Sequence, residues 1–347
     1  MSKRLVVCCD GTWNTPDQQC PTNVTKVALA IALQDHSGRE QRTFYHLGVG
    51  ANRRERIRGG AFGFGLSRDV CAAYRFLVQN FDPGDELFFF GFSRGAFTAR
   101  STAGFVRNCG ILRREHSDRV DEAYELYRSK NSTKHPRSIE ATLFRRSYSH
   151  QTRIRFIGVW DTVGALGIPL DGLRLASLFN RRWQFHDTEL STTVDAAFQA
   201  LAIDEKRGPF RPTLWKQQAD APKDQRVEQV WFAGVHSGVG GGYPDHGLSD
   251  LPLVWMVERA RSCGLAFHPD SFTDWRMDVE PDPLGELNES RTGFYRMVPP
   301  FNRTLGVTDK THEFVASSAV ERHKRLEAYA PSGLVTYLDD DPRIMPA

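Results

Sequence analysis

Short apolar runs that end at a glycine or a polar residue recur along the chain. The clearest are rich in valine, isoleucine or phenylalanine and cover Leu5–Cys9, Thr43–Leu47, Glu86–Phe90, Ile154–Trp160 and Val227–Ala233. Continuous apolar runs of this length, without alternating polar positions, are typical of strands that are buried on both faces. We therefore predict that these segments are strands of one buried sheet.

Segments with the spacing of a helix lie between these runs. In the clearest of them Val70, Tyr74 and Leu77 share one face, and a Pro-Gly pair follows the end of the pattern. Helices are predicted on this basis over Val24–Leu33, Leu66–Asn80, Arg94–Asn108, Arg119–Lys130, Leu248–Cys263 and Glu313–Glu327. The alternation of strands and helices predicts an α/β fold, with a mostly parallel central sheet and helices on both faces.

We expect a single domain over residues 1–347, and two of its regions do not show the alternation of strands and helices. Residues 163–226 mix helix-like stretches with proline-rich, basic loops, and we expect them to form a cap or insertion over the sheet. Residues 268–347 are rich in proline, aspartate and glycine, which favour turns and loops. We expect this last region to be a loop-rich extension that wraps around the domain.

The charges of the chain are nearly balanced. Its 45 basic and 42 acidic residues give a net charge of +3, which offers no general case for a nucleic-acid partner. No segment approaches the roughly 20 apolar residues of a membrane-spanning helix, and the run Leu5–Cys9 is too short for a signal peptide. We expect a cytoplasmic protein, with secretion that needs no cleaved signal as the alternative.

The sequence contains no clear metal or nucleotide motif. None of the six cysteines forms a Cys-x-x-Cys pair and no zinc spacing occurs, so we predict neither a metal nor another cofactor. The glycine-rich stretch Gly59–Gly65 lacks the Lys-Ser/Thr pair of a phosphate-binding loop. Four arginines precede it, and they form either a solvated loop or a patch for an anionic headgroup or carboxylate: Arg53, Arg54, Arg56 and Arg58.

The strongest chemical signal is the stretch Gly91-Phe92-Ser93-Arg94-Gly95, with a predicted strand before it and a predicted helix after it. In such a nucleophile elbow the serine occupies a strained turn above the sheet, and the glycines let neighbouring chain segments approach closely. The amide of Arg94 would face a developing oxyanion at the start of the helix. We predict that Ser93 is a nucleophile; the alternative, a helix N-cap, explains the serine but not both glycines.

A serine nucleophile needs a histidine base, and the base needs an acid that orients it. Asp161 and His236 each follow a predicted strand, at the sheet edge where open α/β sheets place their sites, and in the chain order of α/β-hydrolases. Five glycines surround His236, which suggests main chain packed closely around a site. The prediction is a triad of Ser93, Asp161 and His236, with these residues as alternatives for its base or acid: His246, Asp204 and Asp245.

The loop after the first strand reads Asp10-Gly11-Thr12. An amide from an early loop completes the oxyanion hole of α/β-hydrolases, so Gly11 or Thr12 could act beside Arg94. Asp10 could hold this loop through its amides or contact a substrate, and a plain Asx-turn is the alternative. An aspartyl-phosphatase mechanism is disfavoured, because Cys8 stands where that motif needs its nucleophilic aspartate.

At these residues the chain resembles a family of bacterial and fungal α/β-hydrolases, described as the catalytic domain of type VI secretion phospholipase effectors. The resemblance runs from about Lys3 to Met256 and is carried by the stretches Cys9–Asn14, Gly48–Gly50, Gly84–Arg100, Gly158–Gly164, Ile203–Arg207 and Gly234–Tyr243. It implies an α/β-hydrolase fold and ester hydrolysis, with phospholipids as the substrate of effector members. By position it also implies the triad Ser93, Asp161 and His236.

The function that we expect from the sequence is therefore that of a serine esterase or lipase. Its partner would be a small-molecule or lipid ester, with transient contact to a membrane surface and an oligomeric state that the sequence leaves open. Cleavage of thioesters, amides or peptides on the same fold is one alternative. A binding module that keeps the elbow only as structure is the other.

Overall fold

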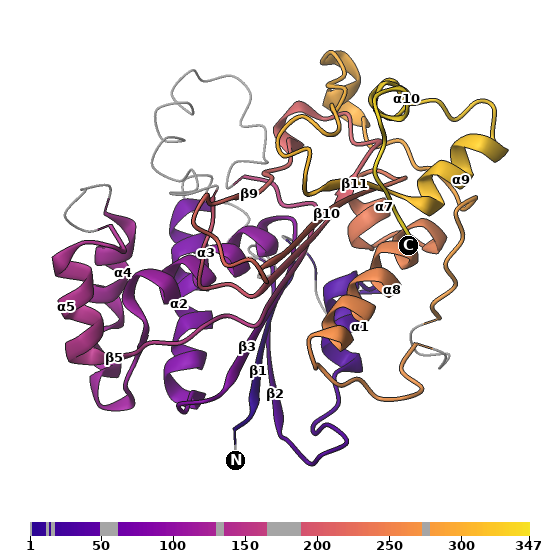
Figure 1. The fold of residues 1–347 in the computed structure, drawn as a ribbon. Coiled ribbons are helices and arrows are strands. Elements are labelled where there is room, and N and C mark those ends of the chain that lie inside the picture. Colours follow the sequence, from indigo (N-terminus) through magenta and orange to yellow (C-terminus); the bar gives the residue numbers. More distant parts are fainter. Residues whose placement is uncertain are drawn as a thin grey trace.

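The computed structural model has a central parallel sheet with helices on both faces (Figure 1). The structure describes residues 2–11, 14, 18–48, 62–129, 135–164, 189–272 and 278–347. Within these residues eight strands pair in the order β12-β11-β10-β8-β6-β3-β1-β2, and every pairing in this sheet is parallel. The predicted α/β fold with a mostly parallel sheet is therefore confirmed.

The strands of this sheet are β1 (Arg4–Cys9), β2 (Gln41–His46), β3 (Glu86–Phe92), β6 (Phe156–Trp160), β8 (Ala196–Ala202), β10 (Arg226–Phe232), β11 (Glu313–Ala316) and β12 (Ile344–Met345). Two short pairs lie outside it: β4 (Ile111–Leu112) with β5 (Ser149–His150), and β7 (Glu189–Leu190) with β9 (Lys216–Gln217).

The helices that flank the sheet differ between its two faces (Figure 1). One face carries α2 (Phe62–Asn80), α3 (Arg94–Cys109), α4 (Val120–Arg128) and α5 (Ile139–Tyr148), and the other carries α1 (Asn23–Ala30) and α8 (Gly247–Ser262). The short α7 (His236–Gly240) follows β10, and α9 (Ser317–Arg325) and α10 (Ser332–Asp339) belong to the C-terminal region.

The strands bury both faces, as their continuous apolar sequences predict. On β1, Val6 packs in one core with residues of α1 and α8, whereas Leu5 and Val7 pack in the other with residues of α2 and α3. On β3, alternate phenylalanines divide between the same two cores. Successive side chains of a strand point to opposite faces, so only an uninterrupted apolar run can fill two cores at once.

The sheet has a switch point between β1 and β3. The chain leaves β1 to form β2 on one side, and it leaves β3 to form β6 on the other side. In open α/β sheets the carboxyl ends of the strands at such a switch point are where ligands usually bind. Ser93 follows β3 at this point, and a Cβ atom added to Gly11 after β1 would lie 3.3 Å from Ser93 Cβ.

The structure corrects two boundaries of the sequence analysis. Residues 163–226 are not simply an insertion over the sheet, because β8 lies inside that range and pairs with both β6 and β10. Residues 165–188 of that range lie outside the described residues. Residues 268–347 do more than wrap, since β11 and β12 extend the sheet, and the helix expected from Glu313 begins as β11 and becomes α9 only at Ser317.

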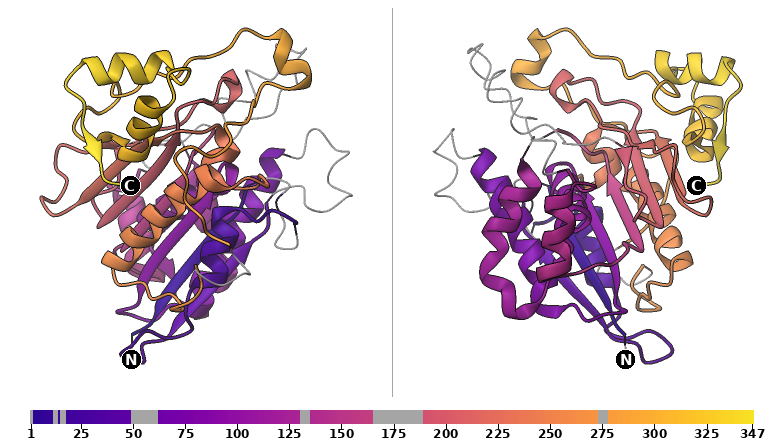
Figure 2. Two further views of the ribbon diagram at one scale, coloured as in Figure 1. Left: turned by 90° about the vertical axis from the view of Figure 1, so that its right-hand side faces the viewer. Right: turned by 60° about the vertical axis from the view of Figure 1, so that its left-hand side comes forward.

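The later part of the C-terminal region, drawn in yellow, lies at the end of the sheet opposite to the N-terminus of the chain in both views (Figure 2). The region begins near the other end of the sheet, where the His268 amide donates to the Ala30 carbonyl at 2.8 Å. Because α/β sheets place their functional loops at the carboxyl ends of the strands, the later part of the region is in a position to contribute side chains to a site.

Candidate active site

Ser93 forms a strained turn between β3 and α3. Its φ of 59° and ψ of −119° lie in a region that residues other than glycine rarely adopt. A Cβ atom at Gly91 would meet the Cα of Ala96 at 2.6 Å, and one at Gly95 would collide with the main-chain oxygens of Cys9 and Asp10. Both glycines of the elbow are therefore required by the close passage of the chain, and a helix N-cap would not need them.

The structure brings Ser93, His236 and Asp161 together at the carboxyl edge of the sheet. The Ser93 Oγ lies 2.8 Å from His236 Nε2, and His236 Nδ1 lies 2.6 Å from Asp161 Oδ2. Asp161 has no exposed surface, whereas Ser93 keeps 9% of its surface accessible. An imidazole whose Nδ1–H donates to a carboxylate presents an unprotonated Nε2, which can accept the proton of the serine hydroxyl.

The imidazole of His236 is enclosed by aromatic side chains. The ring of Phe92 lies 4.7 Å and that of Phe210 lies 4.9 Å from its centroid. Only 4% of His236 is exposed. Apolar rings on the imidazole exclude water and limit its motion, which favours a fixed hydrogen-bond geometry.

The carboxylate of Asp161 receives four donors. Besides His236, the amide of Ala202 donates to Oδ1 at 3.1 Å, and the guanidinium of Arg303 donates to both oxygens at 2.6 and 3.0 Å. Burial would raise the pKa of Asp161, but the positive charge of Arg303 and the contact with His236 outweigh it and hold the pKa below its ordinary value. Asp161 is therefore ionised at neutral pH.

Comparison with models of protein families matches residues 3–259 to the family described as "T6SS, Phospholipase effector Tle1-like, catalytic domain". The chain belongs to this family. The matched residues include Ser93, Asp161 and His236, whereas Arg303 lies beyond them.

The individual proteins that are similar to this Tle1-like domain include one from a yeast and one from a bacterium. It is 29% identical over 243 residues to "Uncharacterized protein YEL023C" of Saccharomyces cerevisiae, and the match covers 64% of the present chain and 34% of the yeast protein. The chain thus spans about a third of that relative's length. A crystal structure of a Pseudomonas aeruginosa protein, described as uncharacterized, matches with 16% identity and a TM-score of 0.47, over 80% of this chain and 48% of the other.

Two charged residues for which the sequence predicts no role contact His236 or Asp161. Glu205 has no exposed surface, accepts the main-chain amide of His236 at 3.3 Å and is ion-paired with Arg207 at 2.8 Å. Arg303 contacts Asp161 directly. Glu205 lies in a stretch that carries the family resemblance, so its position was marked without a role, whereas nothing in the local sequence of Arg303 points to the site.

The alternative acids and base have other partners. Asp204 accepts the amide of Gly234 at 2.8 Å and the hydroxyl of Tyr329 at 2.9 Å, and burial raises its pKa. Gly234 has a φ of 127° and begins the turn that leads to His236, so Asp204 shapes that turn. The other two contact groups around the start of α8: His246 lies 2.6 Å from Asp250, and Asp245 accepts the amides of Gly247 and Glu286.

The loop after β1 is held by Asp10 through a main-chain amide, one of the two roles that the sequence left open. The Gly11 amide donates to Asp10 Oδ1 at 2.6 Å, so in this conformation it is not directed at an oxyanion. Asp10 also accepts from four side chains, which leaves its carboxylate saturated rather than open to a substrate: Asn14, Thr22, Thr25 and Tyr45. Arg94 opens α3 as expected, and Thr12 lies outside the described residues.

Other expectations fall outside what the structure describes. Arg53, Arg54, Arg56 and Arg58 are in this group, as are residues 59–61 of the glycine-rich stretch. Among the described residues, no cluster of three or more His, Cys, Asp or Glu side chains is arranged to hold a metal ion. The same residues include no helix that is both long and apolar enough to cross a membrane.

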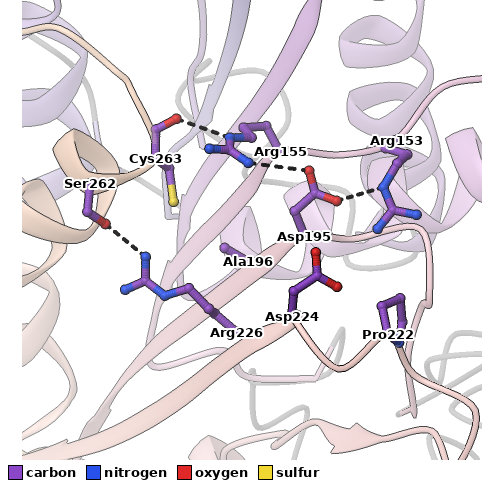
Figure 3. Close-up of a pocket in the computed structure, with 9 residues that line it drawn as sticks. All are labelled: Arg153, Arg155, Asp195, Ala196, Pro222, Asp224, Arg226, Ser262 and Cys263. Carbon is purple, nitrogen blue, oxygen red and sulfur yellow. Dashed lines mark hydrogen bonds and ion pairs between the residues drawn. The ribbon is translucent and has the colours of Figure 1, made fainter.

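A pocket of about 460 Å³ lies at the other end of the sheet and is not lined by Ser93, Asp161 or His236 (Figure 3). It opens beside the amino ends of β6, β8 and β10, where three arginines and two aspartates line it. Asp195 is ion-paired with Arg153 at 2.7 Å, and Arg226 donates to Ser262 at 3.0 Å (Figure 3). The ion pair with Asp195 offsets the charge of Arg153, and the strands separate this pocket from Ser93.

Proposed function

We propose that this Tle1-like domain is a serine hydrolase that cleaves carboxylic esters of lipids through an acyl-enzyme. The observation that carries the proposal is the unbroken hydrogen-bond series from Ser93 Oγ through the imidazole of His236 to Asp161. A strained serine at the switch point of a parallel sheet is the second support. A purely structural turn would need neither the imidazole nor the buried carboxylate behind it.

In the proposed mechanism His236 Nε2 takes the hydroxyl proton while Ser93 Oγ attacks the ester carbonyl carbon. The amide at the start of α3, that of Arg94, would stabilise the oxyanion. Collapse of the tetrahedral intermediate breaks the ester C–O bond, and His236 returns its proton to the departing alcohol. Water then attacks the acyl-Ser93 ester, His236 again acting as base, and releases the carboxylic acid.

The family supports lipids as the substrate class. Its description is that of a phospholipase effector catalytic domain, and lipids with ester-linked acyl chains fit a triad of this kind. The partly exposed ring of Phe210 beside His236 gives the reacting centre an apolar wall, which suits an acyl chain. Thioesters and amides would use the same triad, so the acyl and leaving groups must be tested separately.

The nucleophile is tested by covalent labelling and by turnover together. A fluorophosphonate probe should add its mass to the peptide that contains Ser93, and Ser93→Ala should abolish both labelling and hydrolysis of p-nitrophenyl esters. Ser271→Ala, at a buried serine after α8, is the matched control and should keep both. Turnover that persists in Ser93→Ala at the wild-type rate would refute the proposal.

The substrate class is tested with a panel in which one acyl chain is joined as an ester, a thioester, an amide and a phospholipid. Release of fatty acid from the phospholipid in vesicles or mixed micelles is expected at a rate above that of the matched amide. If short soluble esters are cleaved while every phospholipid in the panel stays intact, the lipid part of the proposal is wrong and the esterase part stands.

A further inference from the structure

Arg303 reaches the triad from a part of the chain that carries no regular secondary structure. It lies between the short 3₁₀ helix Gly293–Met297 and β11, beyond the residues that the family match covers. Only 3% of the residue is exposed, although arginine is rarely buried without a specific partner. Its partner is Asp161, the acid of the proposed triad.

The guanidinium is held by four hydrogen bonds. Its Nη1 donates to Asp161 Oδ1 at 2.6 Å and to the Ala202 carbonyl at 2.7 Å. Its Nη2 donates to Asp161 Oδ2 at 3.0 Å and to the Phe210 carbonyl at 2.6 Å. All four terminal N–H groups are therefore used, and the fork spans both oxygens of one carboxylate, a geometry that lysine cannot reproduce.

We propose that Arg303 is a positioning residue of the active site, and that the C-terminal region completes the site by supplying it; this rests on the proposed hydrolase function. Two further links come from the same region. Ser290 donates to Glu205 at 3.0 Å, and Tyr329 donates to Asp204, which holds the turn before His236. Residues from beyond the family match therefore help to position both Asp161 and the backbone at His236.

The physical reason is that Asp161 must stay both ionised and oriented while it is fully buried. A buried carboxylate without a countercharge tends to take up a proton, and a protonated acid no longer holds the imidazole in the required tautomer. The charged and titratable groups that face the carboxylate are His236 on α7 and Arg303; Glu205 with Arg207 lies behind the imidazole. Within the part of the chain that the structure describes, Arg303 contacts both oxygens and takes no part in proton transfer.

The test compares three variants with the wild type over the pH range of ester hydrolysis. Arg303→Met should lower kcat roughly 10- to 100-fold with little change in KM, because an acid that is no longer clamped misplaces the base. Arg303→Met should also move the acid limb of the pH–rate profile to higher pH. Arg303→Lys keeps the positive charge but loses the two-pronged contact, so its kcat and its acid limb should lie between those of Arg303→Met and the wild type. The control is Arg259→Met, which removes an arginine–carboxylate pair with Glu228 away from the triad and should leave kcat and the pH profile unchanged.

A second measurement needs no turnover. The proton on His236 Nδ1, bonded to a carboxylate, should give a strongly downfield resonance in the NMR spectrum of ¹⁵N-histidine-labelled protein. In the wild type it should persist to low pH, and in a folded Arg303 variant it should vanish at a higher pH. His236→Gln identifies the resonance.

The outcomes separate this inference from the proposed function. Wild-type kcat, acid limb and downfield resonance in a folded Arg303→Met protein would overturn the inference while the hydrolase proposal stands. If Arg303→Met does not fold, Arg303→Lys provides the test. A wild-type kcat, acid limb and resonance in Arg303→Lys would overturn the proposed role of the two-pronged contact. If the wild type hydrolyses no ester, the proposed function fails. The pH dependence of the downfield His236 resonance then remains as the test of whether Arg303 orients Asp161.

Discussion

The main-chain amide of His236 donates to Glu205 Oε2 at 3.3 Å, so a buried carboxylate fixes the backbone of the residue whose imidazole faces Ser93. Glu205 is fixed in turn by Arg207, whose guanidinium donates to both of its oxygens at 2.9 and 2.8 Å. Burial would raise the pKa of Glu205, but Arg207 outweighs it and lowers the pKa. The position of the proposed base thus depends on an ion pair that takes no part in the chemistry.

Glu205→Gln should therefore affect both stability and turnover. Breaking a buried ion pair costs about 3 kcal/mol of unfolding free energy or somewhat more, and the loosened backbone should lower kcat roughly 10-fold. Urea denaturation and ester hydrolysis measure the two effects. Glu313→Gln is the control. The buried Glu313 carboxylate accepts three main-chain amides at a place distant from His236, so its replacement should lower stability without lowering kcat; the amides are those of Gly306, Thr308 and Asp309. Equal kcat values in the two variants would contradict the argument.

Gly95→Ala tests the close passage that shapes the elbow. The added methyl group would collide with the main-chain oxygens of Cys9 and Asp10, neither of which can move without disturbing β1. We expect a loss of about 1–3 kcal/mol of stability from overpacking and a fall in kcat of at least roughly 10²-fold, because the serine is displaced. Gly164→Ala, where a methyl group meets no described residue within 4 Å, should change neither quantity.

Asp161→Asn tests the ionised state of the acid through its pH dependence. The pKa of Asp161 is below its ordinary value in the folded protein, so its charge contributes stability above the pKa of the unfolded chain. That contribution is lost only as the pH falls through the lower, folded pKa. At neutral pH the variant should be about 3–5 kcal/mol less stable, since Arg303 loses its counterion, and the difference should shrink in strong acid.

The same substitution should lower kcat on the order of 10³- to 10⁴-fold, because an asparagine side chain permits the wrong imidazole tautomer. Denaturation curves and ester hydrolysis between mildly alkaline and strongly acidic pH provide the measurement. A stability difference that stays constant across this range would mean that Asp161 carries no charge-dependent contribution.

The sequence anticipates the proximity of Ser93, Asp161 and His236 because each follows a strand whose apolar run is easy to recognise. Parallel strands end at one edge, so residues that follow them converge whatever their separation along the chain. By contrast, β8 was missed because its sequence, Ala-Ala-Phe-Gln-Ala-Leu-Ala, is rich in alanine, which favours helices, and lacks the branched residues typical of strands.

The contact of Arg303 could not be anticipated, because Arg303 follows a Pro-Pro-Phe-Asn segment with no periodic pattern, and only the path of the C-terminal region brings it to Asp161. For the Gly11 amide the sequence left two acceptors open, a developing oxyanion or the carboxylate of Asp10. In the structure this amide donates to Asp10. A hydrogen-bond choice between two nearby acceptors depends on side-chain conformation, which residue spacing does not determine.

Tyr329→Phe tests whether the C-terminal region acts on the turn before His236. The hydroxyl of Tyr329 donates to Asp204 at 2.9 Å, and the same oxygen of Asp204 accepts the amide of Gly234 at 2.8 Å. Removing the hydroxyl should cost about 1 kcal/mol and let this turn shift, so that kcat falls severalfold while KM is retained.

Tyr337→Phe is the matched control for that experiment. Tyr337 is also a buried tyrosine of the C-terminal region, but its hydroxyl contacts the Glu313 carbonyl and the Arg343 amide, each at 3.2 Å, away from His236. Tyr337→Phe should lose at least as much stability as Tyr329→Phe, measured by thermal or urea unfolding, and should keep the wild-type kcat. If both leave kcat at the wild-type value, the Asp204 link is structural only, and the influence of the C-terminal region on the site reduces to Arg303 and to the contact of Ser290 with Glu205.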